Sequence, residues 1–159
     1  MNGVLLYAAV PAAALACALF AGTLRFMRAH MRRRSFRVMA VYFLALWAVM
    51  GLYCGLLIRA PGSEPSVIHW MPFEGYRLED WFGGGGFVMN IAAFAPLGLL
   101  LSHLGMKRGR VCALGLTCSL CLEAAQLMTG RGYCDSADVL ANTLGAAIGA
   151  VLAGKGDRR

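Results

Sequence analysis

Long apolar runs alternate with short polar segments along this chain, and the lengths of the runs predict membrane helices. Residues 4–24 and 38–58 each form a run of 21 residues without a charged side chain. A helix needs about 20 apolar residues to cross the hydrocarbon core of a bilayer. Three later runs are shorter or carry isolated polar groups. The five predicted spans are residues 4–24, 38–58, 87–104, 111–128 and 139–153.

The composition agrees with this pattern. Hydrophobic residues make up 59% of the 159 residues, charged residues make up 14%, and the mean hydropathy is +0.63. Soluble domains carry about a quarter charged residues, and disordered chains are poor in apolar residues. We therefore expect an all-α fold, a polytopic transmembrane helical bundle of about five spans.

The N-terminal part is expected to differ from the rest of the chain. No basic segment precedes the first span and arginines follow it, which favours an uncleaved anchor over a signal peptide. We expect an anchor helix and a basic cytoplasmic loop in residues 1–37, and the main transmembrane domain in residues 38–159.

Charge predicts the orientation of the chain. The net charge is +7, and six arginines lie within residues 25–37. If that segment is cytoplasmic, 12 of the 15 lysines and arginines lie on the cytoplasmic side, leaving Arg59, Arg77 and Arg131 outside. Such asymmetry follows the positive-inside rule. The N-terminus is then outside and the C-terminus is cytoplasmic. Because topology accounts for the charge, we do not expect a nucleic-acid partner.

The cysteines do not indicate a metal or redox centre. Cys118 and Cys121 form a C-x-x-C pattern inside a predicted span, with no second such pattern in the chain. Redox and zinc motifs of this shape usually lie near water. We therefore predict no metal and no other cofactor.

Polar side chains gather near the outer ends of the last three spans. Glu123 lies five residues before the end of its span, which is about 8 Å at 1.5 Å per residue. A carboxyl group in a membrane helix is costly unless it is paired, so it indicates function by default. The candidate ligand-binding residues are Asn90, Glu123, Gln126, Arg131, Asp135, Asp138 and Asn142.

The last span has one continuous face for helix packing. Asp138, Asn142, Gly145 and Gly149 are four, three and four residues apart, which places them on one side of a helix. The two glycines form a GxxxG pattern that lets a neighbouring helix approach closely. Gly98 has the same predicted role, on the face of the third span that carries the asparagine.

Two interpretations of the polar residues stay open at this point. In the structural one, Arg131 pairs with Glu123, Asp135 or Asp138, and the amides only hold helices together. In the functional one, the arginine binds an anionic group, and the carboxyl groups bind hydroxyls or amines. Glu123 and Asp138 are also candidates for general acid or base catalysis.

Four short patterns resemble the VanZ-like family, over roughly residues 38–153. The departures are a glycine-rich segment before Asn90 and a histidine, His69, where an asparagine is frequent. The matching stretches are RGYCDSAD at 131–138 followed by Asn142, Gly145 and Gly149; EAAQ at 123–126; NIAAFAPLG at 90–98; and HWMPF at 69–73.

The resemblance implies a small polytopic protein of the bacterial cytoplasmic membrane, with residues 38–159 as its VanZ-like domain. The member that gives the family its name is linked to teicoplanin resistance, and the biochemical activity of the family is largely undefined. The resemblance therefore bears on fold and location more than on mechanism.

Three functions remain under consideration. The first is an accessory factor of the cell envelope that binds a lipid-linked or peptidoglycan-related ligand through the outer polar cluster. The second is a membrane enzyme that acts on a lipid head group. The third is a structural protein whose partner, besides the lipid bilayer, is a second copy or another membrane protein. A transporter is less favoured, because the chain shows no internal repeat.

Overall fold

The computed structural model describes residues 3–63, 67–82 and 86–154, and this part of the chain is helical almost throughout. The all-α prediction is confirmed. The strands of the described chain are two residues long and form one parallel pair. In chain order the elements are α1 (Gly3–His30), α2 (Arg33–Leu52), the π-helical turn η1 (Tyr53–Leu57), β1 (Ile68–His69), α3 (Leu78–Phe82), α4 (Phe87–His103), α5 (Arg108–Thr129), β2 (Cys134–Asp135) and α6 (Ser136–Leu152).

Four stretches of the described chain are long and apolar enough to cross a membrane. The fifth long helix, α6, has 17 residues, so it is about 25 Å long and shorter than a hydrocarbon core of about 30 Å. It starts at Ser136, upstream of its apolar run. The four membrane-length stretches are Pro11–His30, Arg33–Leu57, Asp80–His103 and Arg108–Thr129.

The arginine-rich segment 25–37 is helical except for residues 31 and 32. We expected a loop, but α1 continues to His30 and α2 starts at Arg33. Arginine and methionine are good helix formers, so the helices extend past their apolar runs. The basic groups therefore lie on the last turns of α1 and the first turns of α2.

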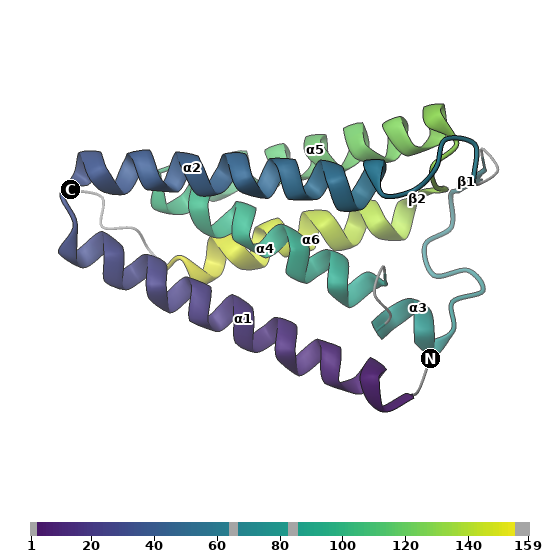
Figure 1. The fold of residues 1–159 in the computed structure, drawn as a ribbon, viewed down its shortest axis with the longest axis horizontal. Helices are drawn as coiled ribbons and strands as arrows, with labels where there is room; N and C mark the ends of the chain where they lie inside the picture. Colours follow the sequence, from purple (N-terminus) through teal and green to yellow (C-terminus); the bar gives the residue numbers. More distant parts are fainter. Residues whose placement is uncertain (1–2, 64–66, 83–85, 155–159) are drawn as a thin grey trace.

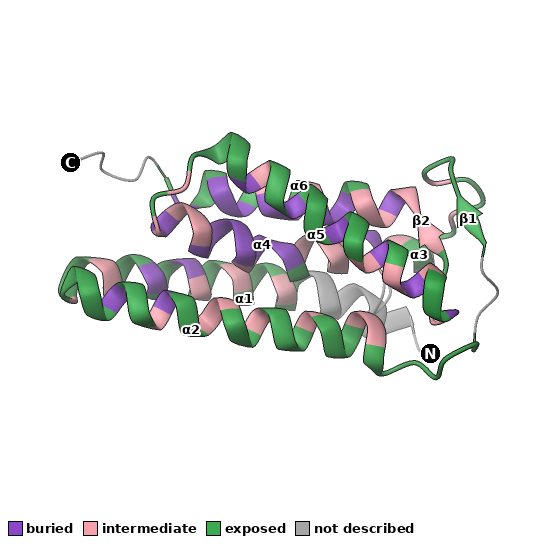
Figure 2. Ribbon diagram, turned by 90° about the horizontal axis from the view of Figure 1, so that it is seen from above, coloured by how far each residue is buried: buried purple, intermediate pink, exposed green. Residues whose placement is uncertain are grey.

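The bundle is built around the pair α4 and α6 (Figure 1). Helix α5 packs along α6, and α1 and α2 both contact α4. Burial follows this order, because half of the α4 span is buried, against 6% of the α2 span. Figure 2 shows buried residues concentrated on α4 and α6, with exposed residues dominating α1 and α2. The centre of the fold therefore lies in the C-terminal part of the chain, which contains α4 and α6.

Three glycines allow the backbones of α4 and α6 to touch. A Cβ atom on Gly98 would overlap the carbonyl oxygen of Ala146. Added Cβ atoms on Gly145 and Gly149 would overlap the carbonyl oxygens of Ile91 and Ala95. Small residues bring membrane helices together in this way. The GxxxG face of α6 is thus occupied by α4 of the same chain.

Two carbonyls of α4 near Pro96 accept contacts from α1 and α2. Pro96 has no N–H group, so the carbonyl four residues earlier loses its helical partner. That carbonyl, on Ala92, accepts a long contact of 3.8 Å from the thiol of Cys17 in α1. The next carbonyl, on Ala93, accepts a hydrogen bond of 2.7 Å from the indole of Trp47 in α2.

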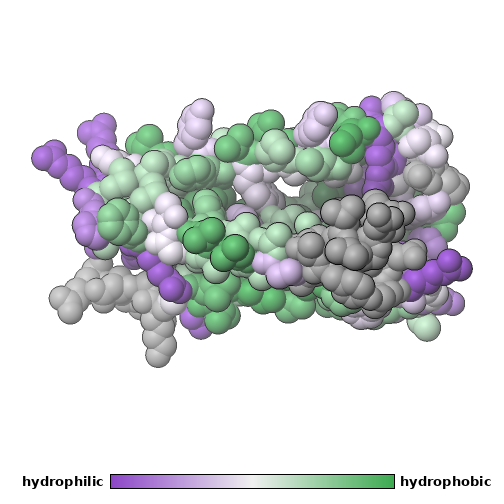
Figure 3. All heavy atoms as spheres, turned by 60° about the horizontal axis from the view of Figure 1, so that its bottom comes forward, coloured by the Kyte–Doolittle hydropathy of each residue, from purple (hydrophilic) through white to green (hydrophobic). Residues whose placement is uncertain are grey.

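Polar side chains gather at the two ends of the molecule, and apolar side chains form the band between them (Figure 3). At the end with the turn between α1 and α2, Arg25 donates to the carbonyl of Leu152, and Arg28 donates to Nδ1 of His103 at 3.2 Å. An apolar cluster that includes Leu24 and Phe36 packs beside them. This distribution is the one expected for a protein whose middle lies in lipid.

The other end carries the long segment between η1 and α4. Its strand β1 pairs with β2 in parallel, with Ile68 opposite Cys134. Aromatic side chains of this segment pack on Phe87 at the start of α4, including Phe73 at 5.1 Å and Trp81 at 5.4 Å between ring centroids. Tryptophan and tyrosine favour the membrane interface, so the sequence of this segment predicts an interfacial position, which the packing of Phe73 and Trp81 on the bundle does not test. The four glycines at 83–86 predict a flexible joint, and residues 83–85 lie outside those that the structure describes.

Candidate functional site

The site lies where η1, α4, α5 and α6 meet at the end opposite the arginine turn. Helix α5 ends at Thr129 and is capped by Gly130, whose φ of 60° is left-handed and accessible to glycine at little cost. The chain then turns back through β2 into α6 within six residues. This short connection holds the end of α5 against the start of α6. Carboxyl groups from both helices therefore meet.

Asp138 and Asn90 form the most direct link between two helices in the site. The amide nitrogen of Asn90 in α4 donates to Oδ1 of Asp138 in α6, at 2.6 Å. Both side chains are partly buried. Asp138 lies in the first turn of α6, where the helix dipole favours a negative charge.

Asp135 and Glu123 are joined through the backbone. Oδ1 of Asp135 caps α6 by accepting from the N–H of Ala137 at 2.8 Å, as aspartate commonly does at this position. The backbone N–H of Asp135 donates to Oε2 of Glu123 at 2.9 Å. The Glu123 side chain is only 2% exposed. The buried acid of α5 is therefore held by the first residue before α6.

Tyr76 completes the group of polar side chains. It interacts with Asp135 by a side-chain hydrogen bond, and with Asp138 and Asp80 through their charges. Burial and these neighbouring carboxylates raise the pKa of the Tyr76 hydroxyl above its ordinary value. We call Asn90, Glu123, Asp135, Asp138 and Tyr76 together the carboxylate cluster.

Gln126 and Arg131 make different contacts from those expected. The amide of Gln126 donates to the carbonyl of Gly55 at 2.6 Å, and the guanidinium of Arg131 donates to the carbonyl of Leu56 at 3.3 Å. Both carbonyls belong to η1, at a helix end where carbonyls lack chain partners. Within the described residues, Arg131 thus binds a carbonyl and not one of the cluster carboxylates.

Arg59 is the cation that acts on the cluster. Its charge interacts with those of Glu123 and Asp138, and its guanidinium donates to the carbonyl of Arg131 at 3.2 Å. Gly132 leaves room for it, because a Cβ atom there would lie 2.7 Å from the Arg59 guanidinium. Arg59 thus approaches the carboxyl groups while it is held by the loop.

Asn142 lies deeper, between α5 and α6. Its amide nitrogen donates to the hydroxyl of Ser119 at 2.9 Å, and both residues are buried. Its other amide atom, Oδ1, is buried and has no hydrogen-bond partner among the described residues. This contact joins two helices through polar groups, as is common inside membranes.

The cluster reaches the surface on one side. Asn90, Tyr76, Asp135 and Asp138 are partly exposed, whereas Glu123 is buried behind them. Carboxylates accept hydrogen bonds and pair with cations. The arrangement can therefore receive an amine or several hydroxyl groups from outside. The described residues contain no group of three or more metal-ligating side chains placed to hold an ion.

The sequence pointed to seven residues, and the structure divides them into three sets. Asn90, Asp138, Asp135 and Glu123 lie together in the cluster. Gln126 and Arg131 bind η1, and Asn142 binds Ser119. The ligand-binding role of all seven stays a prediction.

Sequence reasoning missed Arg59, Tyr76 and Ser119. Arg59 directly follows an apolar run, so its position could have indicated an interfacial contact. Ser119 lies four residues before Glu123, on the same helix face, which is a readable signal. Tyr76 had no such signal, because only the folded path of the segment brings it to Asp135.

Comparison with known proteins agrees with this arrangement. A model of the VanZ/LLP1 family matches residues 58–154. The chain belongs to the VanZ/LLP1 family. The match contains the whole carboxylate cluster, together with Arg59, Gln126, Arg131 and Asn142, whereas α1 and α2 precede it. No curated protein and no solved structure matches the chain.

Proposed function

We propose that this VanZ/LLP1 protein is an accessory factor of the bacterial cell envelope. In this proposal, the carboxylate cluster faces the outside of the plasma membrane and binds a lipid-linked or cell-wall-related ligand. Family membership supports a polytopic membrane protein. What we propose beyond family membership is the class of ligand and a role in teicoplanin tolerance, which the resemblance to the family implies.

The observation that carries the proposal is the set of contacts around Asp138. Three carboxyl groups meet at the junction of α5 and α6, and the nearby guanidinium of Arg131 is bound to a carbonyl instead. Asn142 and Ser119 bind each other between two helices, away from the surface. Carboxylates have about four acceptor positions each, so accepting capacity remains at the surface.

The chemistry of the cluster favours a ligand that donates hydrogen bonds. Amines and sugar hydroxyls provide such donors, and cell-wall precursors carry both kinds of group. Asp138 and Asp135 would contact the ligand, whereas the buried Glu123 would only add negative charge to the site. An anionic group is less suited to this side of the site, because the cluster has more carboxylates than cations.

Tolerance of teicoplanin gives a direct test. In a sensitive bacterium that expresses the full chain, we expect Asp138→Asn to reduce teicoplanin tolerance to the level of the empty vector. Glu74→Gln is the matched control, because Glu74 is an exposed acid at the same end of the molecule, in the segment between η1 and α4. Membrane abundance of each variant is measured alongside, so that a loss of protein is recognised.

Binding by the purified protein tests the same site without cells. Native mass spectrometry with teicoplanin, and separately with a lipid-linked muropeptide, is expected to show a complex for the wild type. Asp138→Asn should lose that complex and Glu74→Gln should keep it. A wild type that binds neither probe and leaves tolerance unchanged would overturn the proposal, as would full binding by Asp138→Asn.

A further inference from the structure

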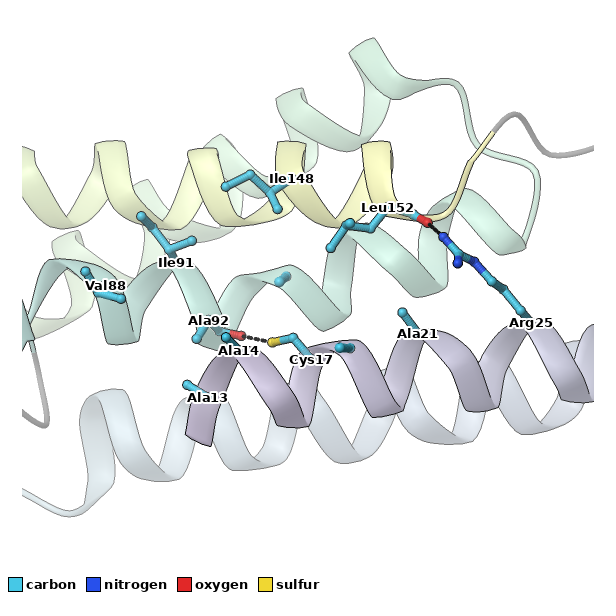
Figure 4. Close-up of a pocket in the computed structure, with 12 residues that line it drawn as sticks. Ala13, Ala14, Cys17, Ala21, Arg25, Val88, Ile91, Ala92, Ile148 and Leu152 are labelled. Atoms are coloured by element: carbon cyan, nitrogen blue, oxygen red, sulfur yellow. Dashed lines mark hydrogen bonds between the residues drawn. The ribbon is translucent and has the colours of Figure 1, made fainter. Parts of the chain in front are cut away.

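A groove runs between α1 and the pair α4 and α6, and none of its lining residues belongs to the carboxylate cluster (Figure 4). Its volume is about 460 Å³, within the range of about 300–1,000 Å³ that ligand pockets span. Small side chains of α1, such as Ala14, Cys17 and Ala18, form one wall. Ile91 of α4 and Ile148 of α6 stand opposite.

The groove is open along the side of α1. Ala14 and Ala18 are exposed and end at Cβ, so they leave space that larger residues would fill. The surrounding surface is part of the apolar band in Figure 3. Water in a groove at this level would face apolar walls, so an apolar occupant is favoured there.

One end of the groove is cationic. Arg25 lines it and donates to the carbonyl of Leu152, which uses one of the five N–H donors of a guanidinium. Arg28, one turn further along α1, donates to His103. The charges of both arginines act on His103, and no described carboxylate acts there. This end therefore has positive charge without a compensating anion among the described residues.

We propose that the groove binds one acyl chain of an anionic phospholipid, whose phosphate is held by Arg25 and Arg28. Guanidinium groups bind phosphate through paired hydrogen bonds, and basic residues near a membrane surface attract anionic lipids. The apolar length of the groove and its cationic end match the two parts of such a lipid.

The size of the groove argues against a helix from a second copy as the occupant. A helix about 10 Å across with a rise of 1.5 Å per residue takes up about 120 Å³ per residue. The groove would hold about one turn of such a helix. An acyl chain is thin enough to lie along it. The proposal does not depend on the ligand of the carboxylate cluster.

Native mass spectrometry of the full chain tests the proposal. Detergent-purified protein is offered phosphatidylglycerol and phosphatidylcholine with the same acyl chains. We expect the wild type to retain one phosphatidylglycerol in preference. Arg25→Gln and Arg28→Gln should each reduce that retention about fivefold, the factor expected for one basic residue at an anionic surface. Arg25→Lys keeps the charge and should retain the lipid.

A second variant tests the acyl chain separately. Ala18→Phe fills the groove and should lose the phosphatidylglycerol adduct, while its melting temperature reports that the bundle is folded. Ala16→Phe places the same ring on an exposed position outside the groove. Arg37→Gln removes the same charge from α2. Both control variants should bind lipid as the wild type does.

The results that overturn the proposal are distinct. If Arg37→Gln weakens retention as much as Arg25→Gln, the attraction is general and not local to the groove. If Ala18→Phe retains the lipid, the acyl chain does not lie there. A lipid-free dimer as the main species would assign the groove to a second copy. Loss of teicoplanin binding affects none of these measurements.

Discussion

At the scale of single residues, the polar groups of this protein differ in what remains available to a ligand. Gln126 and Arg131 each donate to a carbonyl of η1. Asp138 accepts one hydrogen bond from Asn90 and is partly exposed. Residues of similar polarity and depth therefore contribute either to stability or to a binding surface, and their partners decide which.

The contact of Arg131 predicts a stability effect. Arg131→Ala leaves the partly buried carbonyl of Leu56 without its donor, which costs about 1–3 kcal/mol. The measurement is thermal unfolding in detergent, where a lower melting temperature is expected. Arg77→Ala is the control, because it removes an exposed cation from the segment between η1 and α4. Equal melting temperatures for the two variants would contradict the structural role of Arg131.

The surroundings of Cys134 predict slow thiol chemistry. Burial and the charges of Glu123 and Asp135 raise the pKa of the Cys134 thiol. At a given pH the reactive thiolate is then a smaller fraction, so labelling by a maleimide is slower. With Cys134 as the sole cysteine, we expect Asp135→Asn to accelerate labelling at pH 8.

The choice of asparagine isolates the charge in that experiment. Asparagine caps a helix about as well as aspartate, so the start of α6 is retained while one negative charge is removed. A labelling rate that stays the same in Asp135→Asn would show that the carboxylate does not act on the thiol.

At the scale of the elements, the contact between α4 and α6 organises the bundle. Backbone atoms of one helix lie against glycines of the other at three positions. Helices α1 and α2 join this pair through the carbonyls near Pro96. The elements that precede the family match thus dock on a centre that the matched part builds by itself.

A methyl group at the contact predicts a measurable loss of stability. In Gly149→Ala the new Cβ would overlap the carbonyl oxygen of Ala95, and backbone cannot move aside as a flexible side chain can. Overpacking of this kind costs about 1–3 kcal/mol. Gly22→Ala is the matched control in α1, where nothing lies within 4 Å of the added atom. We expect a lower melting temperature for Gly149→Ala alone.

The sequence was most informative where one physical rule dominates. Run length predicted the helices, and the spacing of Gly145 and Gly149 indicated a close-packed face. It was least informative where a contact depends on an irregular local structure. The carbonyls that bind Gln126 and Arg131 become available because η1 widens to a π-turn, with Ile58 donating to Tyr53. No residue pattern in the apolar run 38–58 predicts this π-turn. Arg131 was therefore expected beside the carboxylates.

At the scale of the whole molecule, the two polar ends differ in sign. The turn between α1 and α2 carries arginines, whereas the opposite end carries the carboxylate cluster. A bilayer with the cytoplasm at the basic end satisfies the positive-inside rule. That orientation is a prediction, and every envelope-facing role depends on it.

Cysteine labelling tests the orientation. In a variant whose six cysteines are replaced by serine, we expect Ser63→Cys to react with a membrane-impermeant maleimide in intact cells. Arg34→Cys should react only after the membrane is opened. Both positions are exposed in the structure, so exposure alone does not separate them. The reverse labelling pattern would place the carboxylate cluster in the cytoplasm.

The glycine contact also determines which part of the site can adapt. Gly145 meets Ile91 beside Asn90, so neither α4 nor α6 can slide along its neighbour without a backbone collision. We therefore expect Asn90 and Asp138 to keep the same spacing when a ligand binds. Tyr76 is carried by the segment between η1 and α4, outside the long helices. For the proposed ligand site, we therefore expect selectivity between ligands of different size to depend on the Tyr76 side.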